Sequence, residues 1–364
     1  MDGRILFLPG DGVGPEILRE ARRVLEAIEE LYGHRFDIIE GSMGAEAIER
    51  FGTPLPEETR KLAVSVDAVL LGAVGFAVQP VNGTTVDPAK GLLELRELLG
   101  NYANLRPIAV PDTVVGTSPF RADHVRGVDL VIVREALGGI YYGRPRGIEN
   151  GVAYDTEIYT EAEIRRIAES AFELARTRRR KVTSIDKANV LASSVLWRRI
   201  TGEVAGQYAD IEFGSMFVDN CAMQLISNPR QFDVVLTNNM FGDILSDEAA
   251  VLCGSLGMLP SASVGGDVGL YEPVHGTAPD IAGKGLANPV GAILSVAMML
   301  DLTFALPEEA NAIGDAVARV LRDGYATADL WAAGGRAPVS TAEMGTLVVG
   351  ALGTPKRAKR EQRC

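Results

Sequence analysis

The sequence predicts an α/β fold built around a largely parallel sheet. Short apolar runs typical of buried strands recur along the chain and alternate with amphipathic helical patterns. The 364 residues, 47% of them hydrophobic and 23% charged, suffice for two domains with sizeable cores. We expect buried strands at residues 5–8, 68–71, 130–133, 182–185 and 234–236.

Three helices have recognisable limits in the sequence. The first begins near Pro15, because proline suits the first position of a helix. The second begins at a capping box formed by Thr160 and Glu163, and we expect it to end in the basic run 178–181, whose cations suit a solvent-facing helix C-terminus. A third helix is expected over residues 307–324.

The charge and cysteine content restrict the class of protein. A net charge of −12 disfavours binding to nucleic acid, which carries its own negative charge. The three widely spaced cysteines suggest a reducing compartment. The longest apolar stretch, residues 290–300, is too short to span a membrane, and the first residues show no signal-peptide pattern. We therefore expect a cytoplasmic protein that works without a membrane or nucleic acid.

A glycine-rich loop, residues 10–14 (GDGVG), lies between the first predicted strand and the first helix. It resembles a dinucleotide-binding phosphate loop, for which Asp37 or Glu40 could be the ribose-binding acid. However, the last glycine arrives one residue early, and tight turns use glycine for steric reasons as well. The loop alone therefore favours a simple turn, with a phosphate loop as the alternative.

Two carboxylates, Asp243 and Asp247, are four residues apart and would share one face of a helix. Like charges at this spacing repel each other unless a cation lies between them, and carboxylate oxygens suit Mg²⁺ or Mn²⁺. Asp219, which we place beyond a predicted turn, could supply a third ligand. The alternative is that these acids only cap or solvate a helix.

Four basic residues lie where a carboxylate substrate could be held. Arg134 ends an apolar strand, Arg96 and Arg106 flank the segment NYAN, and Lys187 follows another strand. Arginine binds a carboxylate through two parallel hydrogen bonds, and a lysine with a lowered pKa can accept a proton. Taken alone, each arginine is more often part of a surface ion pair, and Lys187 is more often a plain surface lysine. A polar loop that starts at His275 and is rich in glycine and proline is predicted to bind a ligand.

Seven segments in this order resemble the β-decarboxylating dehydrogenase family of isocitrate and isopropylmalate dehydrogenases: GDGVGPE, NYANLRP, VREALGGIYYGRPRG, SIDKANVL, FGDILSDEAA, GSLGMLPSAS and YEPVHGTAPDIAGKGLANP. The resemblance runs from about residue 5 to residue 352. It implies a two-domain α/β/α sandwich around a mixed, mostly parallel sheet, which is not a Rossmann fold. Residues 1–101 and 254–364 would form the NAD-binding domain, and residues 102–253 the dimerisation, metal- and substrate-binding domain.

The resemblance also assigns the cofactor. NAD would bind against the loop that starts at His275, and Asp280 would hold the hydroxyls of the adenosine ribose. Because an acid at this position repels a 2′-phosphate, NAD is favoured over NADP. The implied cofactor-binding residues are Glu272, His275, Gly276, Ala278, Asp280, Ile281 and Asn288.

The same resemblance assigns the chemistry. Mg²⁺ or Mn²⁺ would bind to Asp243, Asp247 and Asp219, the last supplied by the partner subunit of a homodimer. The substrate carboxylates would be held by Arg96, Arg106 and Arg134. Lys187, also from the partner subunit, would help remove the proton of the C2 hydroxyl, and Tyr141 would protonate the enol carbon that decarboxylation leaves.

Apolar side chains are implied to surround the C3 substituent of the substrate, namely Leu92, Leu93 and Val190. An apolar wall favours an alkyl group over the extra carboxylate of isocitrate. The chain departs from the family at Ala89, where a glutamate is usual, and in the loop that follows Val74, where Gly75-Phe76-Ala77 replaces Gly-Gly-Pro. The loss of the glutamate at Ala89 would make the pocket larger and less charged.

The expected reaction is the NAD-dependent oxidative decarboxylation of a 3-substituted malate, a small-molecule substrate. We favour 3-isopropylmalate, converted to 4-methyl-2-oxopentanoate in leucine biosynthesis. A bulkier alkyl- or arylmalate, or tartrate, is the alternative. A catalytically silent regulatory subunit is a third hypothesis, disfavoured because every implied metal carboxylate, the lysine and the tyrosine are present.

Overall fold

The computed structural model describes residues 1–75, 79–81, 84–330 and 336–353, and the predictions for Phe76 and Ala77 lie outside these ranges. The chain divides into two compact units. Unit 1 contains Met1–Leu99, Ser255–Ala262 and Gly266–Cys364, and unit 2 contains Gly100–Gly254 and Ser263–Gly265. The roles predicted for the two parts of the chain remain predictions.

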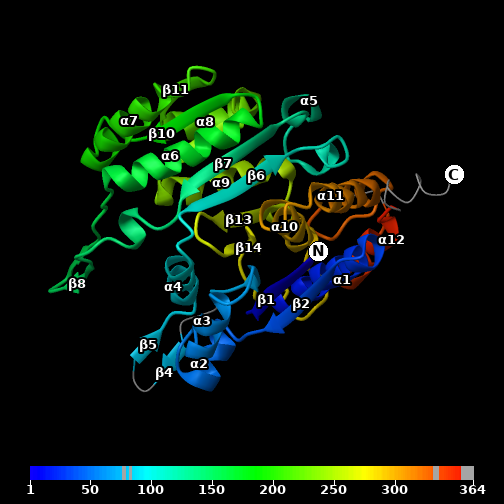
Figure 1. Ribbon diagram of the computed structural model, residues 1–364. Helices are drawn as coiled ribbons and strands as arrows, with labels where there is room; N and C mark the ends of the chain where they lie inside the picture. The colour runs from blue at the N-terminus through cyan, green and yellow to red at the C-terminus, as the bar shows by residue number, and fades with distance from the viewer. Residues whose placement is uncertain (76–78, 82–83, 331–335, 354–364) are drawn as a thin grey trace. The chain divides into compact units, whose positions relative to one another are not determined.

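The sheet strands of unit 1 run parallel to one another and follow the order β14-β3-β1-β2. The neighbouring strands β1 and β2 are drawn in blue in Figure 1. All six residues of β3 are buried, as expected for a strand that is covered on both faces. The strands are β1 (Asp2–Gly10), β2 (Arg35–Glu40), β3 (Ala68–Ala73) and β14 (Gly269–Pro273), and β13 (Pro260–Val264) has residues in both units. The short strands β4 (Gln79–Val81) and β5 (Thr84–Val86) form a separate hairpin.

The helices of unit 1 pack their apolar faces onto this sheet and onto one another. Helix α1 buries Ile17, Ala21, Val24 and Ile28, which recur at helical spacing, so the helix predicted near Pro15 is confirmed. The other helices are α2 (Ala45–Phe51), α3 (Glu57–Ala63), α4 (Ala89–Leu99), α10 (Val290–Leu302), α11 (Pro307–Arg322) and α12 (Thr341–Ala351), and α1 itself spans Gly14–Tyr32.

The sheet strands of unit 2 follow the order β11-β10-β12-β7-β6. Strands β7, β10, β11 and β12 are parallel, whereas β6 runs antiparallel to β7, so the predicted mixed and mostly parallel sheet is confirmed. The strands are β6 (Ala103–Ala109), β7 (Asp129–Glu135), β10 (Lys181–Asp186), β11 (Glu212–Phe217) and β12 (Val234–Thr237). All five strands predicted from the sequence are present in the two units.

Helices α6 (Glu161–Arg176) and α7 (Ala192–Ala205) cover one apolar cluster of unit 2, in which Phe172 and Trp197 are the largest fully buried side chains. The predicted capping box at the start of α6 is formed. The remaining elements of unit 2 are α5 (Ala122–Val125), α8 (Val218–Ser227), α9 (Asn239–Ala250) and a hairpin of β8 (Gly147–Glu149) and β9 (Val152–Tyr154).

The prediction that the basic run 178–181 ends helix α6 was wrong. The predicted exposure to solvent is confirmed for Arg179 and Arg180 but not for Arg178, which is partly buried. The helix ends at Arg176. Arg178 bonds the buried carboxylate of Asp233 at 2.8 Å as well as Asp129 at 2.8 Å. The run therefore neutralises acidic groups beside the sheet, because a buried carboxylate needs a partner.

Polar residues gather where the strands of each unit end. In unit 2, β7 ends at Glu135 and β12 leads directly into α9; in unit 1, β14 leads into the loop that starts at His275. Ligands of α/β proteins commonly bind at the carboxyl ends of parallel strands. No helix in the described part of the chain is long and apolar enough to cross a membrane.

Candidate active site

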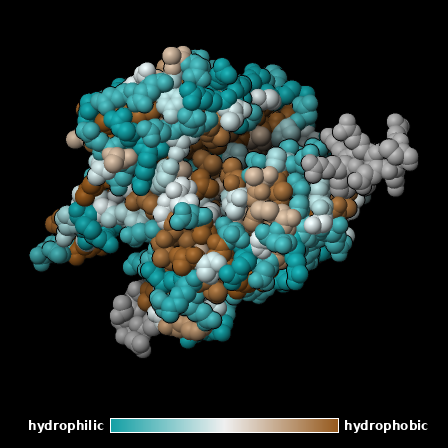
Figure 2. All heavy atoms as spheres, in the orientation of Figure 1, coloured by the Kyte–Doolittle hydropathy of each residue, from teal (hydrophilic) through white to brown (hydrophobic). Residues whose placement is uncertain are grey.

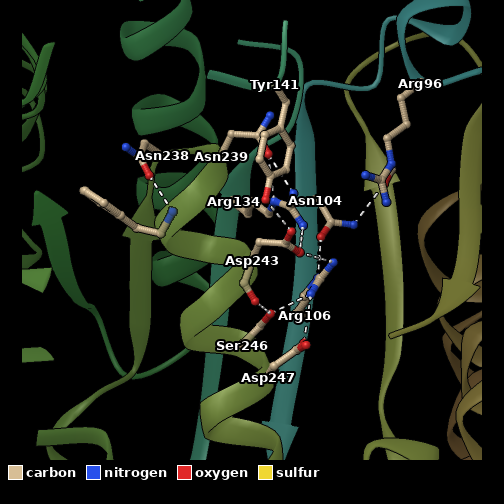
Figure 3. Close-up of polar contacts among 12 residues, drawn as sticks. Arg96, Asn104, Arg106, Arg134, Tyr141, Asn238, Asn239, Asp243, Ser246 and Asp247 are labelled. Carbon is tan, nitrogen blue, oxygen red and sulfur yellow. Dashed lines mark hydrogen bonds and ion pairs between the residues drawn. The ribbon is translucent and has the colours of Figure 1, made fainter. Parts of the chain in front are cut away.

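Arg134, at the end of β7, forms the centre of a charged cluster in unit 2 with Asp243 of α9 (Figure 3). The guanidinium is buried, and its Nη1 donates to the Asp243 carboxylate. Its Nε and Nη2 donate to the side-chain oxygen of Asn239 at 3.0 and 2.7 Å. The arginine is therefore held in one orientation by two different partners.

Arg106 of β6 reaches the same carboxylates from the neighbouring strand. Its Nη2 lies 3.4 Å from Asp243 and its Nη1 lies 3.6 Å from Asp247. Its Nε donates to Asn104 at 2.8 Å, and its Nη1 donates to Ser246 Oγ at 2.6 Å. Two guanidinium groups thus meet the two carboxylates that are one helical turn apart on α9.

Tyr141 completes the cluster. Its hydroxyl donates to Asp243 Oδ2 at 2.8 Å, and the Arg134 guanidinium lies 5.7 Å from the centre of its ring. Burial, together with the hydrogen bond to Asp243, raises the pKa of Tyr141 to about 12. The phenol therefore keeps its proton at neutral pH and is available as a proton donor.

Asp247 and Asp243 lie on one face of α9, as their spacing predicts. Burial is the main cause that raises the pKa of Asp247 above its usual range. A cation near this carboxylate would stabilise its charged form. Among the described residues, however, no three acidic, histidine or cysteine side chains gather closely enough to hold a metal ion.

Lys187 and Asp219 form a second charged pair of unit 2. Lys187 follows β10, and its Nζ donates to Asp219 Oδ1 at 2.7 Å. This contact lowers the pKa of the Asp219 carboxyl. Asp219 lies in the first turn of α8, directly after β11.

In unit 1 the structure pairs two residues for which the sequence predicts different ligands. Arg96 of α4 and Glu272 of β14 are both buried, and Arg96 Nη2 donates to Glu272 Oε1 at 2.6 Å. Arg96 was assigned to a substrate carboxylate and Glu272 to the cofactor. Because of this ion pair, the Arg96 guanidinium and the Glu272 carboxylate lie next to each other in unit 1.

The loop from His275 to Asn288 is shaped mainly by its backbone. His275 Nδ1 lies 2.9 Å from the Gly276 carbonyl, and its buried Nε2 has no hydrogen-bond partner among the described residues. Burial lowers the pKa of His275, so the imidazole is neutral at pH 7. Asn288 donates to Asp329 at 3.1 Å, and Asp280 is exposed.

The glycine-rich loop supports this segment. Gly12 has a φ of +58°, and a Cβ atom there would lie 2.1 Å from the Thr277 carbonyl oxygen. The amide of Val13 donates to that same oxygen at 2.9 Å. A glycine is therefore required at residue 12 so that the two loops can approach each other. Positive φ also occurs at Ala278.

The three apolar residues implied for the C3 pocket differ in their surroundings. Leu92 of α4 is half-buried and packs against the core of unit 1, and Leu93, the next residue, is half-buried as well. Val190, in the turn before α7 of unit 2, is 70% exposed. Ala89 is exposed at the first residue of α4.

Three residues of the unit 2 cluster were not predicted from the sequence: Asn104, Asn239 and Ser246. Each holds the guanidinium of Arg106 or Arg134 and bears no charge. The only signal in the sequence is position, since Asn239 follows an apolar strand and Ser246 lies between the two aspartates of α9. Polar residues at strand ends are common in loops, so this signal is weak.

Residues 4–348 match the model of the family described as isocitrate/isopropylmalate dehydrogenase. A 3-isopropylmalate dehydrogenase of Shouchella clausii is 53% identical over 99% of this chain and 100% of the relative. One from Geobacillus kaustophilus is 56% identical over 94% of this chain and 93% of the relative. The solved structure of isocitrate dehydrogenase from Methylococcus capsulatus is similar with a TM-score of 0.85 and 38% identity, over 96% of this chain and 99% of that one.

Proposed function

The chain belongs to the isocitrate/isopropylmalate dehydrogenase family, and from this premise we propose that it catalyses the NAD-dependent oxidative decarboxylation of 3-isopropylmalate to 4-methyl-2-oxopentanoate in leucine biosynthesis. The observation that carries the proposal is the cluster of Arg106, Arg134, Tyr141 and Asp243 at the strand ends of unit 2. It offers two cations for a dicarboxylate, a protonated phenol and a carboxylate for a metal ion.

The arginines would bind the substrate through its carboxylates. Arg134 and Arg106 are fixed by Asn239 and by Asn104 and Ser246, so they present fixed donors and lose little freedom when substrate binds. Arg96, fixed by Glu272 in unit 1, would provide a further cation. The two carboxylates of the substrate could accept paired hydrogen bonds from these guanidinium groups.

Two residues would transfer protons, Lys187 as the acceptor and Tyr141 as the donor. Lys187 would assist removal of the proton from the C2 hydroxyl, and the hydride from C2 would go to the nicotinamide of NAD. Loss of the C3 carboxylate as CO₂ leaves an enol, and Tyr141 would protonate its carbon. Since the pKa of Tyr141 is raised to about 12, its phenol carries the proton that this step needs.

The carboxylates of α9 fit a divalent metal ion, because Asp243 and Asp247 lie one helical turn apart on the same face and oxygen ligands suit Mg²⁺ or Mn²⁺. Asp243 and Asp247 would hold the ion together with Asp219 of the partner subunit. A bound ion would polarise the C2 oxygen and stabilise negative charge during loss of CO₂.

The cofactor would bind to unit 1 along the loop from His275 to Asn288, with Glu272 near the nicotinamide ribose. Asp280 is exposed there and would accept hydrogen bonds from the adenosine ribose. A carboxylate in this position repels the 2′-phosphate of NADP. The neutral imidazole of His275 leaves Nε2 as a hydrogen-bond acceptor.

A homodimer would complete each site. Among the described residues Asp219 contacts Lys187 and joins no metal-binding group with Asp243, so both residues would serve the partner's site. Apolar side chains available for an interface are exposed on α8 and α9, at Met223 and Ile244. The β8–β9 hairpin also exposes apolar residues, and apolar surface is visible on it in Figure 2.

The choice of 3-isopropylmalate follows the relatives that are named for this substrate, which are 53–56% identical to the chain, whereas the isocitrate dehydrogenase is 38% identical. The departure at Ala89 keeps a bulkier alkylmalate as the second candidate. We also propose a cytoplasmic location, consistent with the two buried free thiols, Cys221 and Cys253.

A substrate panel tests the proposal. NADH formation would be measured with NAD, Mn²⁺ and, in turn, 3-isopropylmalate, longer alkylmalates, tartrate and isocitrate. We expect the highest kcat/KM with 3-isopropylmalate. A bulkier malate in first place would reject the proposed substrate while keeping the reaction, and no turnover of any malate would reject both.

A subunit-mixing experiment tests the shared site. Lys187→Met and Asp243→Asn variants would each be inactive as homodimers. Co-expressed with two affinity tags, they should form hybrid dimers in which one site has neither substitution, so about a quarter to a half of the normal activity is expected. Inactive hybrids would contradict a site shared between subunits.

A further inference from the structure

Arg198 of α7 joins the two segments that carry Lys187 and Asp219, and it lies outside every segment assigned a role above. We propose that Arg198 is a positioning residue that holds Lys187 and Asp219 next to each other, so that both side chains reach the active site of the partner subunit. The proposal rests on the proposed function for the roles of these two residues. Arg198 itself would touch neither substrate nor cofactor.

The first contact of Arg198 fixes the backbone at Lys187. Asp186, the last residue of β10, has a fully buried carboxylate. Arg198 Nε and Nη2 donate to its two oxygens, each at 2.8 Å, in the paired geometry that only arginine provides. Asp186 Oδ1 also accepts from the amide of Ala188 at 2.9 Å. The carboxylate therefore holds the chain on both sides of Lys187.

The second contact fixes the start of the helix that carries Asp219. The guanidinium of Arg198 lies 4.7 Å from the centre of the Phe217 ring, within the range of cation–π attraction. Phe217 is the last residue of β11 and is paired in register with Asp186 of β10. Two residues later, Asp219 lies in the first turn of α8.

Helix α7 gives Arg198 a rigid base. The preceding residue, Trp197, is buried, and its Nε1 donates to Ser184 Oγ of β10 at 3.1 Å. Thr201, on the next turn of the helix, accepts from the same Ser184 hydroxyl at 3.3 Å. The helix is thus bonded to the strand that ends at Asp186, and the side chain of Arg198 starts from a fixed point.

These contacts explain how Lys187 and Asp219 are kept together. Each residue is partly exposed, and a pair formed by exposed side chains alone is weakly held. Arg198 removes freedom from both backbones at the strand ends, so Lys187 Nζ and Asp219 Oδ1 stay 2.7 Å apart. Supporting contacts of this kind commonly change metal affinity or activity when they are lost.

Arg198→Ala tests this role, with Arg199→Ala as the matched control. Arg199 is the next residue on α7, is exposed, and pairs with Glu161 and Glu203 on the surface. We expect Arg198→Ala to lower kcat with 3-isopropylmalate roughly 10- to 100-fold and to weaken Mn²⁺ binding by a similar factor. The KM for NAD should match that of Arg199→Ala, because the cofactor loop belongs to unit 1. The melting temperature of Arg198→Ala should be the lower of the two, because the buried Asp186 carboxylate loses its partner.

Added guanidinium ion provides a readout that a structural defect would not give. It should restore part of the kcat of Arg198→Ala and leave that of Arg199→Ala unchanged. Equal kcat in the two variants would overturn the proposal. A loss of kcat in Arg198→Ala that parallels the fall in its melting temperature, and that guanidinium does not restore, would also overturn it. If Arg198→Ala fails to fold, Asp186→Asn should show the same loss of kcat, and full activity of that variant would overturn the proposal.

Failure of the proposed function would look different. If neither the unsubstituted protein nor Arg199→Ala turns over 3-isopropylmalate, the proposed substrate is rejected. Mn²⁺ affinity, measured by electron paramagnetic resonance without turnover, then decides the role of Arg198 alone. Weaker binding in Arg198→Ala than in Arg199→Ala would support it, and equal binding would overturn it.

Discussion

The charged cluster of unit 2 and the cofactor loop of unit 1 are held in place by different forces. Around Asp243, two guanidinium groups and a phenol are bonded to carboxylates and neutral polar side chains. Most hydrogen bonds of the loop from His275 to Asn288 involve its backbone groups, and the Thr277 carbonyl lies close against Gly12. The cluster should therefore be sensitive to changes of charge, and the loop to changes of backbone shape.

The largest effect on stability should follow from Asp243→Ala. This substitution removes the carboxylate that the buried guanidiniums of Arg134 and Arg106 share, and breaking a buried ion pair costs about 3–5 kcal/mol. Asp247→Ala is the matched control, because Asp247 is 60% exposed and its pair should contribute under about 1 kcal/mol. Urea unfolding measures both changes, and equal small losses would contradict a cluster held by charge.

Tyr141→Phe should affect catalysis far more than stability. Loss of the phenol removes a hydrogen bond worth about 1 kcal/mol, whereas loss of the proton donor should lower kcat roughly 10²- to 10⁴-fold. NADH and product formation at saturating substrate measure the second effect. A kcat within twofold of the unsubstituted protein would show that another group protonates the enol.

Gly12→Ala probes the loop of unit 1. Alanine would have to adopt a φ of +58° with its Cβ 2.1 Å from a carbonyl oxygen, so we expect a loss of about 1–3 kcal/mol and a higher KM for NAD. For stability, Gly276→Ala is the control, since a Cβ there meets nothing within 4 Å. Equal free energies of unfolding for the two variants would contradict the tight approach.

The smallest effect is a pH dependence due to His275. Burial lowers its pKa below the ordinary value of 6.5, so between the two pKa values the unfolded chain binds the proton and the folded chain does not. Stability should therefore fall as the pH drops through about 6.5. His275→Gln should flatten this part of the curve of unfolding free energy against pH, and an unchanged slope would contradict the assignment.

The sequence predicts what depends on local spacing. Asp243 and Asp247 are four residues apart, so their common helix face follows from helical geometry. The ion pair of Arg96 with Glu272 could not be predicted, because 176 residues separate the partners and either could have met another charge. Asn239 was not predicted, because nothing in the sequence indicates that its neutral amide accepts hydrogen bonds from Arg134.

The contact between Lys187 and Asp219 could not be predicted from the sequence either. Both were singled out from the sequence, yet their pairing depends on β10 and β11 being adjacent and in register, which only the sheet topology determines. The contacts of Arg198 are harder still to predict from the sequence, because they also depend on how α7 packs against those strands.

The central claim is tested most directly by product analysis. The protein would be incubated with NAD, Mn²⁺ and 3-isopropylmalate, and NADH, CO₂ and the organic product would be quantified together. The account predicts one CO₂ and one 4-methyl-2-oxopentanoate for each NADH, with all three abolished by chelation of the metal ion. NADH formed without CO₂, or undiminished product after chelation, would contradict it.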